Sequence, residues 1–258
     1  MAYEYIMYEK KDRIAYITMN RPEVLNALHA PAHCEMYEAF CDFRDDPGVW
    51  VAILTGAGDR AFSAGNDLKY QAAGAPLGRK MPPGGFGGIT RDFECFKPII
   101  AAVNGYALGG GVEIVLACDI IIAADHARFG VPEPHVGLNC DTALRRMPRQ
   151  IPLKLAMGLI LTGRHITAQE AYRIGMVNEV VPLKEVMPCV EGWAADIVRG
   201  APLSVRSSKE AVMKSMDVPL QEGLSTDYPL SRAMRESEDI IEGPKAFAEK
   251  RPPVWKGR

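Results

Sequence analysis

The sequence lacks the cysteine patterns that mark disulfide frameworks and zinc sites. It has six cysteines, but none form a CxxC pair or a zinc-like spacing. Reduced thiols in a cytosolic protein fit this distribution, so we expect a cytoplasmic location. One of them lies near the central motif described below, although a lone cysteine is more often filler than nucleophile. The six are Cys34, Cys41, Cys95, Cys118, Cys140 and Cys189.

Long apolar runs and an excess of positive charge are also missing. Asn104, Glu113 and Asp119 interrupt the longest apolar region, so we expect no membrane span. The first residues, MAYEYIMYEKKDRIAY, contain no apolar core of signal-peptide length. The formal net charge is −2, and lysine and arginine are scattered except in the final R-P-P-V-W-K-G-R. Such a balance excludes a nucleic-acid footprint, so we expect no nucleic-acid partner.

Nucleotide-binding motifs are absent as well. The only glycine triplet, Gly109–Gly111, is not part of a G-x-G-x-x-G pattern, and nothing matches a P-loop. Hydrophobic residues make up 48% and charged residues 24% of the 258 residues, as in an ordinary globular protein. This length suits one α/β domain or a domain with a helical appendage.

What is present is an alternation of strand and helix patterns, which predicts a parallel-rich α/β sheet. Arg21-Pro22 ends a first hairpin, and Asn26 is the predicted cap of a helix that runs to about Arg44. Thr167 and Glu170 form a predicted capping box. The predicted strands are Tyr5–Lys10, Arg13–Met19, Val49–Thr55, Pro98–Val103 and the segment M-V-N-E-V-V-P. Further predicted helices are Asp92–Phe96, Leu153–Thr162 and, from Lys184 onward, helices broken at Pro202, Pro219 and Pro244. The Gly/Pro-rich stretch Gln71–Thr90 is predicted to be a mobile lid or binding loop.

The glycine triplet is the most informative feature. Three glycines weaken a helix or strand, but they suit a backbone that must approach another group closely. The first N–H groups of a helix also lack partners, so they can bind an anion or a polarised carbonyl oxygen. Gly109–Gly111 therefore predicts an oxyanion site. The alternative is a tight strand-to-helix crossing, with Glu113 as a partner of the helix dipole.

Two glutamates accompany the triplet. Glu113 follows Gly110 by about one helical turn and can face the same region. Glu133 lies between two prolines, and a carboxylate held beside apolar segments is costly without a task or a partner. The alternative for Glu133 is a salt bridge to Arg145 or Arg146.

Several motifs in order and spacing resemble the enoyl-CoA hydratase/isomerase (crotonase) superfamily over nearly the whole chain. They include N-R-P-E-V-L-N-A-L, A-F-S-A-G-N-D-L-K, K-P-I-I-A-A-V-N-G-Y-A-L-G-G-G-V-E, F-G-V-P-E and L-T-G-R. The resemblance implies an α/β fold, a crotonase-like spiral of β-β-α turns with a C-terminal helical region. We expect the spiral core over residues 1–200 and the helical region, involved in trimer packing, over residues 201–258. The expected assembly is a homotrimer or a hexamer made of two trimers.

The resemblance also implies a site for acyl-CoA thioesters. Backbone N–H groups of Asn66 and Gly110 would form the oxyanion hole, and Glu113 and Glu133 would transfer protons to and from water and the substrate. No metal or cofactor is expected, because coenzyme A is part of the substrate. The remaining expected substrate-binding residues are Ala64, Gly65, Asp67, Leu68, Gly109 and Asp141. For the Asn66–Asp67 loop, the alternative is an ordinary turn capped by Asp67.

The sequence departs from hydratases after Glu133. A G-x-x-P-G-x-G-G-like loop is usual there, but Ala143 and Leu144 replace its paired glycines. Asp141 has a counterpart in dienoyl-CoA isomerases, which usually carry Asp where this chain has Glu113, and in carnitinyl-CoA dehydratases, which keep both glutamates. Hydration or dehydration is therefore favoured over double-bond isomerisation, with a non-catalytic acyl-CoA-binding protein as a third possibility.

Three points stay open at this stage. Asp141 could simply pair with Arg145, four residues later. His135 is left out of the catalytic set, because lone histidines near sites are more often structural. The acyl group, its length and the stereochemistry depend on Gln71–Thr90 and on the C-terminal helices.

Overall fold

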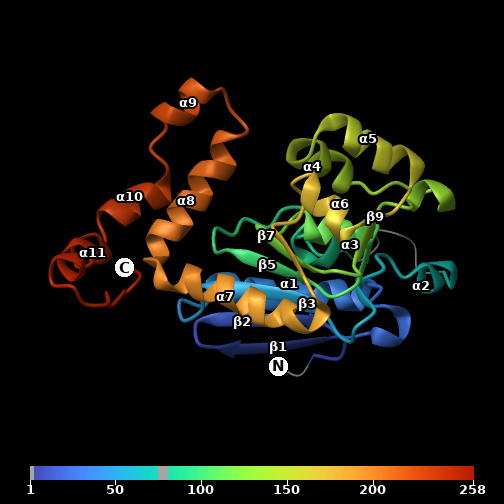
Figure 1. Cartoon of the computed structure of the whole chain (residues 1–258), viewed down its shortest axis with the longest axis horizontal. Helices are drawn as coiled ribbons and strands as arrows, with labels where there is room; N and C mark the ends of the chain where they lie inside the picture. The colour runs from blue at the N-terminus through green and yellow to red at the C-terminus, as the bar shows by residue number, and fades with distance from the viewer. Residues whose placement is uncertain (1–2, 75–80) are drawn as a thin grey trace.

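The computed structural model describes residues 3–74 and 81–258 (Figure 1), which include two sheets. The six-stranded sheet has the order β1-β2-β3-β5-β7-β10, and the four-stranded sheet has the order β4-β6-β8-β9. The strands of the first sheet are β1 Ile6–Lys11, β2 Ile14–Met19, β3 Val51–Gly56, β5 Ile99–Val103, β7 Ile120–Ala124 and β10 Glu179–Val181. The strands of the second are β4 Ala61–Ser63, β6 Tyr106–Leu108, β8 Arg128–Gly130 and β9 Ile166–Thr167.

The chain alternates between the two sheets. Three strands of the first sheet, β3, β5 and β7, each lead into a short strand of the second, β4, β6 and β8. A helix follows each pair: α2 Leu68–Ala72, α3 Gly110–Val115 and, after a 3-10 turn, α4 Ala143–Gln150. The strands β2, β3, β5, β7 and β10 are parallel neighbours, whereas β1 and β9 join antiparallel. This repeat confirms the predicted α/β spiral of β-β-α turns.

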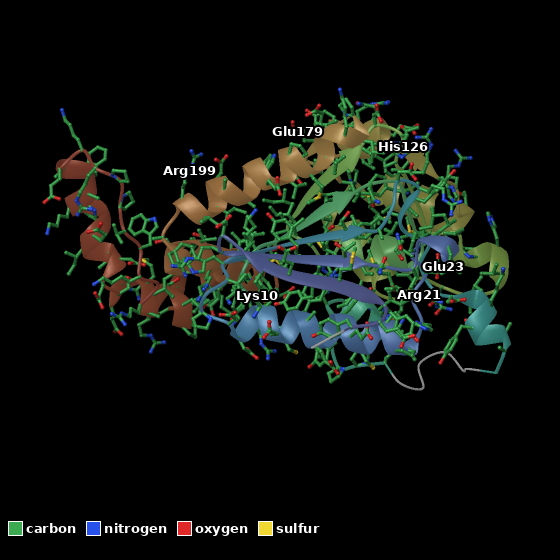
Figure 2. The ribbon with its side chains drawn as sticks, turned by 90° about the horizontal axis from the view of Figure 1, so that it is seen from below. Lys10, Arg21, Glu23, His126, Glu179 and Arg199 are labelled. Atoms are coloured by element: carbon green, nitrogen blue, oxygen red, sulfur yellow. The ribbon has the colours of Figure 1, made fainter. Side chains whose placement is uncertain are left out.

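Helices cover both faces of the six-stranded sheet. α1 Ala30–Asp45 lies on one face and α7 Val186–Arg199 on the other (Figure 2). α5 Leu153–Thr162 and α6 Ala168–Arg173 gather with α4 near α3, whereas the last helices extend away from the sheets (Figure 1). Those last helices are α8 Pro202–Ser215, α9 Leu220–Ser225, α10 Pro229–Arg235 and α11 Asp239–Ala248. Short 3-10 turns are η1 Pro22–Val24, η2 Phe86–Gly88, η3 Glu133–Val136 and η4 Leu183–Glu185.

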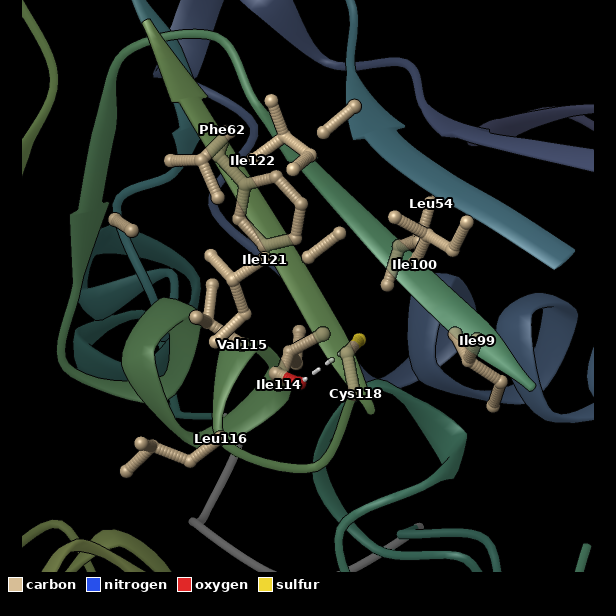
Figure 3. Close-up of a cluster of buried hydrophobic side chains, with 14 of the residues drawn as sticks. Leu54, Phe62, Ile99, Ile100, Ile114, Val115, Leu116, Cys118, Ile121 and Ile122 are labelled. Atoms are coloured by element: carbon tan, nitrogen blue, oxygen red, sulfur yellow. Dashed lines mark hydrogen bonds between the residues drawn. The ribbon is translucent and has the colours of Figure 1, made fainter. Parts of the chain in front are cut away.

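The part of the core that supports the central motif lies between α3 and the central strands (Figure 3). Every residue of β5 is buried, as expected for a central parallel strand covered on both faces. α3 is also buried throughout, and its Ile114 packs in the cluster that contains Phe62, Ile100 and Ile122. The central motif therefore begins inside a rigid core, which fixes the residues that follow.

Three predicted features are wrong. Asn26 does not cap a helix, because α1 begins at Ala30 and His29 is its N-cap. The buried Asn26 amide instead donates to Ala57 O at 3.0 Å and Ala61 O at 2.8 Å, so long-range bonds hold it. Asp92–Phe96 is not helical.

Pro244 does not break its helix but lies within α11. The C-terminal tail secures this helix, because Lys256 N and Gly257 N donate to Asp239 at 2.7 and 2.8 Å. These tertiary bonds support a helix that proline alone would disfavour.

Two further expectations are only partly addressed. Residues 75–80 of the predicted mobile loop lie outside the described residues, and the part from 81 onward contains η2. Among the described residues, no helix is both long and apolar enough to cross a membrane. The division at residue 200 stays a prediction.

Candidate active site

The glycines at the start of α3 are required by close contacts. Gly109, the N-cap, has φ +55, and a Cβ there would collide with the carboxyl group of Glu133. A Cβ on Gly110 would collide with the ring of Phe86. The close approach that the triplet predicted therefore involves the second predicted glutamate itself.

The loop after β4 meets the same glycines. Gly65 has φ +88, and a Cβ there would lie 2.6 Å from Leu108 O and 2.9 Å from Gly110 N. A parallel bridge places Asn66 opposite Leu28, whose N–H donates to Gly65 O at 2.8 Å. Throughout residues 3–74 and 81–258, the N–H groups of Asn66 and Gly110 donate no hydrogen bond. Two unpaired donors on touching loops are the arrangement that an oxyanion requires.

Glu113 is buried behind these donors, with 6% of its surface exposed. Its Oε1 accepts hydrogen bonds from Thr142 N at 2.6 Å and Ala143 N at 3.4 Å. Backbone donors of this kind stabilise the ionised form of a carboxyl group. The loop that lacks paired glycines thus supplies the partners of Glu113.

Glu133 has a different environment. Its Oε2 is buried and has no hydrogen-bond partner among the described residues. Burial raises the pKa of Glu133, and the charge of Glu113 adds to the increase, while hydrogen bonds from its own backbone and from Cys140 oppose it. The two carboxyl groups are therefore near enough to interact, and Glu113 takes its backbone donors from the loop at Thr142 and Ala143.

The alternative salt bridge for Glu133 is not found. Arg145 pairs with Asp141, and Arg146 donates to Thr90 O at 2.8 Å. Neither arginine compensates the burial of Glu133.

The sequence and the fold of this chain are similar to those of known proteins. The family model described as enoyl-CoA hydratase/isomerase matches residues 9–258. The chain belongs to the enoyl-CoA hydratase/isomerase family. Carnitinyl-CoA dehydratase of Citrobacter koseri is 44% identical over 262 residues, with 99% of each chain covered. Carnitinyl-CoA dehydratase of Escherichia coli is 45% identical over 253 residues, with 95% of each covered. Among solved structures, an enoyl-CoA hydratase from Mycobacterium tuberculosis has a TM-score of 0.92 and 37% identity, covering 98% of this chain and 99% of that one.

The loop that we predicted to bind substrate contains a capped turn. Its role in binding substrate stays a prediction. Asp67 accepts from Tyr70 N at 3.0 Å at the start of α2 and pairs with Arg21 at 2.9 Å (Figure 2 labels Arg21). Burial opposes ionisation, but these two partners hold the pKa of Asp67 below its ordinary value. Ala64 N donates to Leu25 O at 2.9 Å, and Leu68 is exposed. The turn alternative is thus found, next to the N–H group of Asn66.

Asp141 is held by two arginines. Its carboxylate, 40% exposed, forms ion pairs with Arg91 and Arg145, so the expected alternative pairing is present. A substrate-binding role for Asp141 stays a prediction. His135 is exposed, and its ring lies against Gly163 at the end of α5.

Sequence reasoning gave no role to three residues of this site. Phe86 lies against Gly110, and its ring centroid is 4.4 Å from that of His33, edge to face. His33 Nδ1 accepts from Gly87 N at 3.1 Å, which fixes η2 over α3. Cys140 is only 4% exposed, and its burial, together with the nearby charges of Glu113 and Glu133, raises the pKa of its thiol. Only the fold reveals these contacts, because most of the partners are far apart in sequence.

Among the described residues, no cluster suited to a metal ion is found.

Proposed function

We propose that this enzyme adds water across the C2=C3 bond of a 2-enoyl-CoA thioester, or removes water from a 3-hydroxyacyl-CoA. The observation that carries the proposal is the proximity of Glu113 and Glu133 beside Gly109–Gly110. Oε1 of Glu113 accepts hydrogen bonds from backbone N–H groups of the following loop, whereas Oε2 of Glu133 is buried without a partner among the described residues. Carboxyl groups in such unlike environments can divide the roles of base and acid.

The thioester carbonyl is proposed to bind between the N–H groups of Asn66 and Gly110. Addition of water at C3 moves negative charge onto this oxygen as an enolate forms. Donors fixed in place before the reaction stabilise that charge more than they stabilise the neutral carbonyl, and the loss of one donor in other enzymes costs about 10²–10³ in kcat.

Glu113 is proposed to be the base and Glu133 the acid in the hydration direction. Ionised Glu113 accepts a proton from water as its oxygen bonds to C3, and protonated Glu133 gives its proton to C2 of the enolate. The water oxygen and one of its hydrogens form the C3 hydroxyl group, the other water proton is left on Glu113, and the new hydrogen on C2 comes from Glu133. Transfer of a proton from Glu113 to Glu133, directly or through solvent, restores the starting enzyme. Dehydration is the same sequence in reverse. Neither direction includes a redox step, and we propose that coenzyme A takes part only as a portion of the substrate.

Two proteins that are 44% and 45% identical are named carnitinyl-CoA dehydratase. We propose dehydration of a 3-hydroxyacyl-CoA of this kind as the first reaction to test. Double-bond isomerisation is the second candidate, because the matching family model covers hydratases and isomerases. It moves protons only, so it adds no solvent oxygen to the product.

We further propose that the enzyme works in the cytoplasm as a homotrimer or as a hexamer of paired trimers. The observation that supports the assembly is a set of exposed apolar side chains on the projecting helices. Contacts with other subunits would cover them. They are Val212, Met213, Met216, Leu220, Leu224, Ile241 and Phe247.

The deciding experiment measures turnover of carnitinyl-CoA and crotonyl-CoA in water labelled with heavy oxygen. The wild type is compared with Glu113→Gln, Glu133→Gln and the control Glu170→Gln, which alters only the exposed capping box of α6. We expect label in the hydroxyl group of the product from crotonyl-CoA and loss of the hydroxyl group as water from carnitinyl-CoA, with a loss of about 10²-fold or more in turnover for each site variant only. An isomerised product without label would show that the enzyme is a double-bond isomerase and would refute the proposed hydration. Tight binding of the thioester without any turnover would indicate a non-catalytic acyl-CoA-binding protein.

A further inference from the structure

The backbone around Asn66 fixes the direction of its N–H group. Leu28 N donates to Gly65 O at 2.8 Å, and Asp67 N donates to Leu28 O at 2.9 Å, so the residues before and after Asn66 are bonded to the same partner. In such a parallel bridge the middle residue turns its own N–H and C=O to the opposite side. The Asn66 N–H therefore points away from Leu28, and within the part of the chain that the structure describes it has no protein partner.

The side chain of Asn66 is held separately from its backbone. Its Nδ2 donates to Oε1 of Gln71 at 2.7 Å, and both residues are partly buried. Throughout residues 3–74 and 81–258, this is the one side-chain hydrogen bond of Asn66. A side chain that is bonded in this way has fewer orientations available, and so has the Cα atom that carries it.

Gln71 is itself well placed to hold another residue. It lies in α2 (Figure 1), and its N–H donates to Asp67 O at 3.0 Å. The Asp67 side chain caps the same helix through Tyr70 N at 3.0 Å and pairs with Arg21 at 2.9 Å. Because Asp67 is buried, this end of α2 is bonded to the interior of the protein. The Gln71 oxygen thus restrains Asn66 rather than following its motion.

We propose that Gln71 is a positioning residue for the oxyanion site: its side-chain oxygen holds Asn66, and through Asn66 the backbone N–H that binds the thioester oxygen. This inference rests on the proposed function, which gives that N–H its role. A donor stabilises the growing charge only when it lies at hydrogen-bond distance from the oxygen of the enolate. A displacement of about 1 Å in an active site costs about 10²-fold in rate. In this proposal Gln71 touches no reacting atom and acts only through Asn66.

The kinetics of Gln71→Met separate positioning from a purely structural role. Methionine has a similar length, but its sulfur is only a weak acceptor. We expect kcat to fall about three- to tenfold, as for the loss of one hydrogen bond between neutral groups. KM should change less than about twofold, because an aligned donor acts mainly in the transition state. Gln169→Met, at an exposed position of α6, is the matched control and should change neither constant.

A double-mutant cycle tests whether Gln71 acts through Asn66. Asn66→Ala keeps the backbone N–H but removes the amide that Gln71 holds. Gln71→Met should therefore cost nothing further in the Asn66→Ala background. Equal losses in the two backgrounds would overturn the proposal, because Gln71 would then act on another part of the protein.

A spectroscopic measurement does not depend on turnover. Butyryl-CoA is a saturated thioester that cannot be hydrated, and ¹³C in its carbonyl group identifies the C=O stretching band of the bound molecule. Hydrogen bonds from the oxyanion site should lower this frequency below that of the free thioester. Gln71→Met should reverse part of the shift, whereas Gln169→Met should leave it unchanged.

This measurement also separates the positioning role from the proposed function. A wild-type frequency in Gln71→Met saturated with butyryl-CoA would overturn the positioning role, even if hydration takes place. A wild type that turns over no thioester, but whose shift is reduced in Gln71→Met, would refute the proposed function and support the role of Gln71.

Discussion

The backbone N–H of Thr142 donates to Oε1 of Glu113 at 2.6 Å, across 29 positions of the sequence. The loop that departs from the usual glycine pattern is thus the loop that holds the carboxylate proposed as the base. Its altered sequence keeps a backbone donor where a side-chain partner would otherwise be needed. Changes near either end of this contact should affect chemistry before they affect folding.

Gly109→Ala should damage both the site and the fold. The new Cβ would occupy a left-handed backbone position and collide with the Glu133 carboxyl group. We expect about 10²-fold lower kcat and a stability loss of about 1–3 kcal/mol, measured by turnover and by urea unfolding. Gly175→Ala is the control, because Gly175 also has positive φ but nothing within 4 Å of its Cβ position. Equal losses of activity in both variants would contradict a special role for Gly109.

The features predicted correctly from sequence depend on local signals. The capping box of Thr167 and Glu170, the cap at Asp67 and the helix Leu153–Thr162 each rest on neighbouring residues, and all three are present. The family motifs extended this to the spiral fold, which local patterns alone did not reveal. The prediction at Asn26 was wrong because its amide bonds to residues more than 30 positions away.

The candidate site was predictable in part for the same reason. Glycines and glutamates beside strand ends indicate chemistry by their types and spacing. The hydrogen bond from Thr142 N to Glu113 and the contact of Phe86 with Gly110 depend on how α3 packs against later and earlier loops. No pattern within a short window carries that information.

His33 should make stability sensitive to acid. Its burial lowers its pKa to about 3, with a smaller effect of His29. An unfolded histidine titrates near its ordinary value of about 6.5, so the unfolded state binds the extra proton between these two values. Stability is then fully present above about pH 6.5 and is lost progressively as the pH falls toward 3.

The measurement is the melting temperature as a function of pH. His33→Gln retains an acceptor for Gly87 N but does not titrate, so its curve should be flatter between pH 6.5 and 4. His126→Gln, at an exposed site, should follow the wild type. A wild-type slope that persists in His33→Gln would assign the acid sensitivity to other groups.

Removal of Arg21 should destabilise the loop that carries Asn66. Both partners of the Arg21–Asp67 pair are mostly buried, and Arg21 also donates to Ala27 O at 2.6 Å. Arg21→Met leaves Asp67 charged without its partner, so we expect a loss of about 2–4 kcal/mol and a higher KM for the thioester. Arg199→Met, which breaks an exposed pair with Asp196, should change neither quantity. An unchanged KM in Arg21→Met would separate this ion pair from substrate binding.

Asp141→Asn tests whether this aspartate, which we predicted to bind substrate, has a chemical role. Its two ion pairs are partly exposed, and interactions of this kind contribute little to stability because water screens them. Its carboxylate is also engaged by Arg91 and Arg145 rather than by either glutamate. We therefore expect kcat to change by less than about threefold and the melting curve to stay nearly the same, whereas Glu133→Gln loses about 10²-fold. Arg91→Met and Arg145→Met should behave like Asp141→Asn. If the kcat of Asp141→Asn alone fell as far as that of Glu133→Gln while its melting curve stayed unchanged, Asp141 would have to leave the arginines and act on the substrate during turnover.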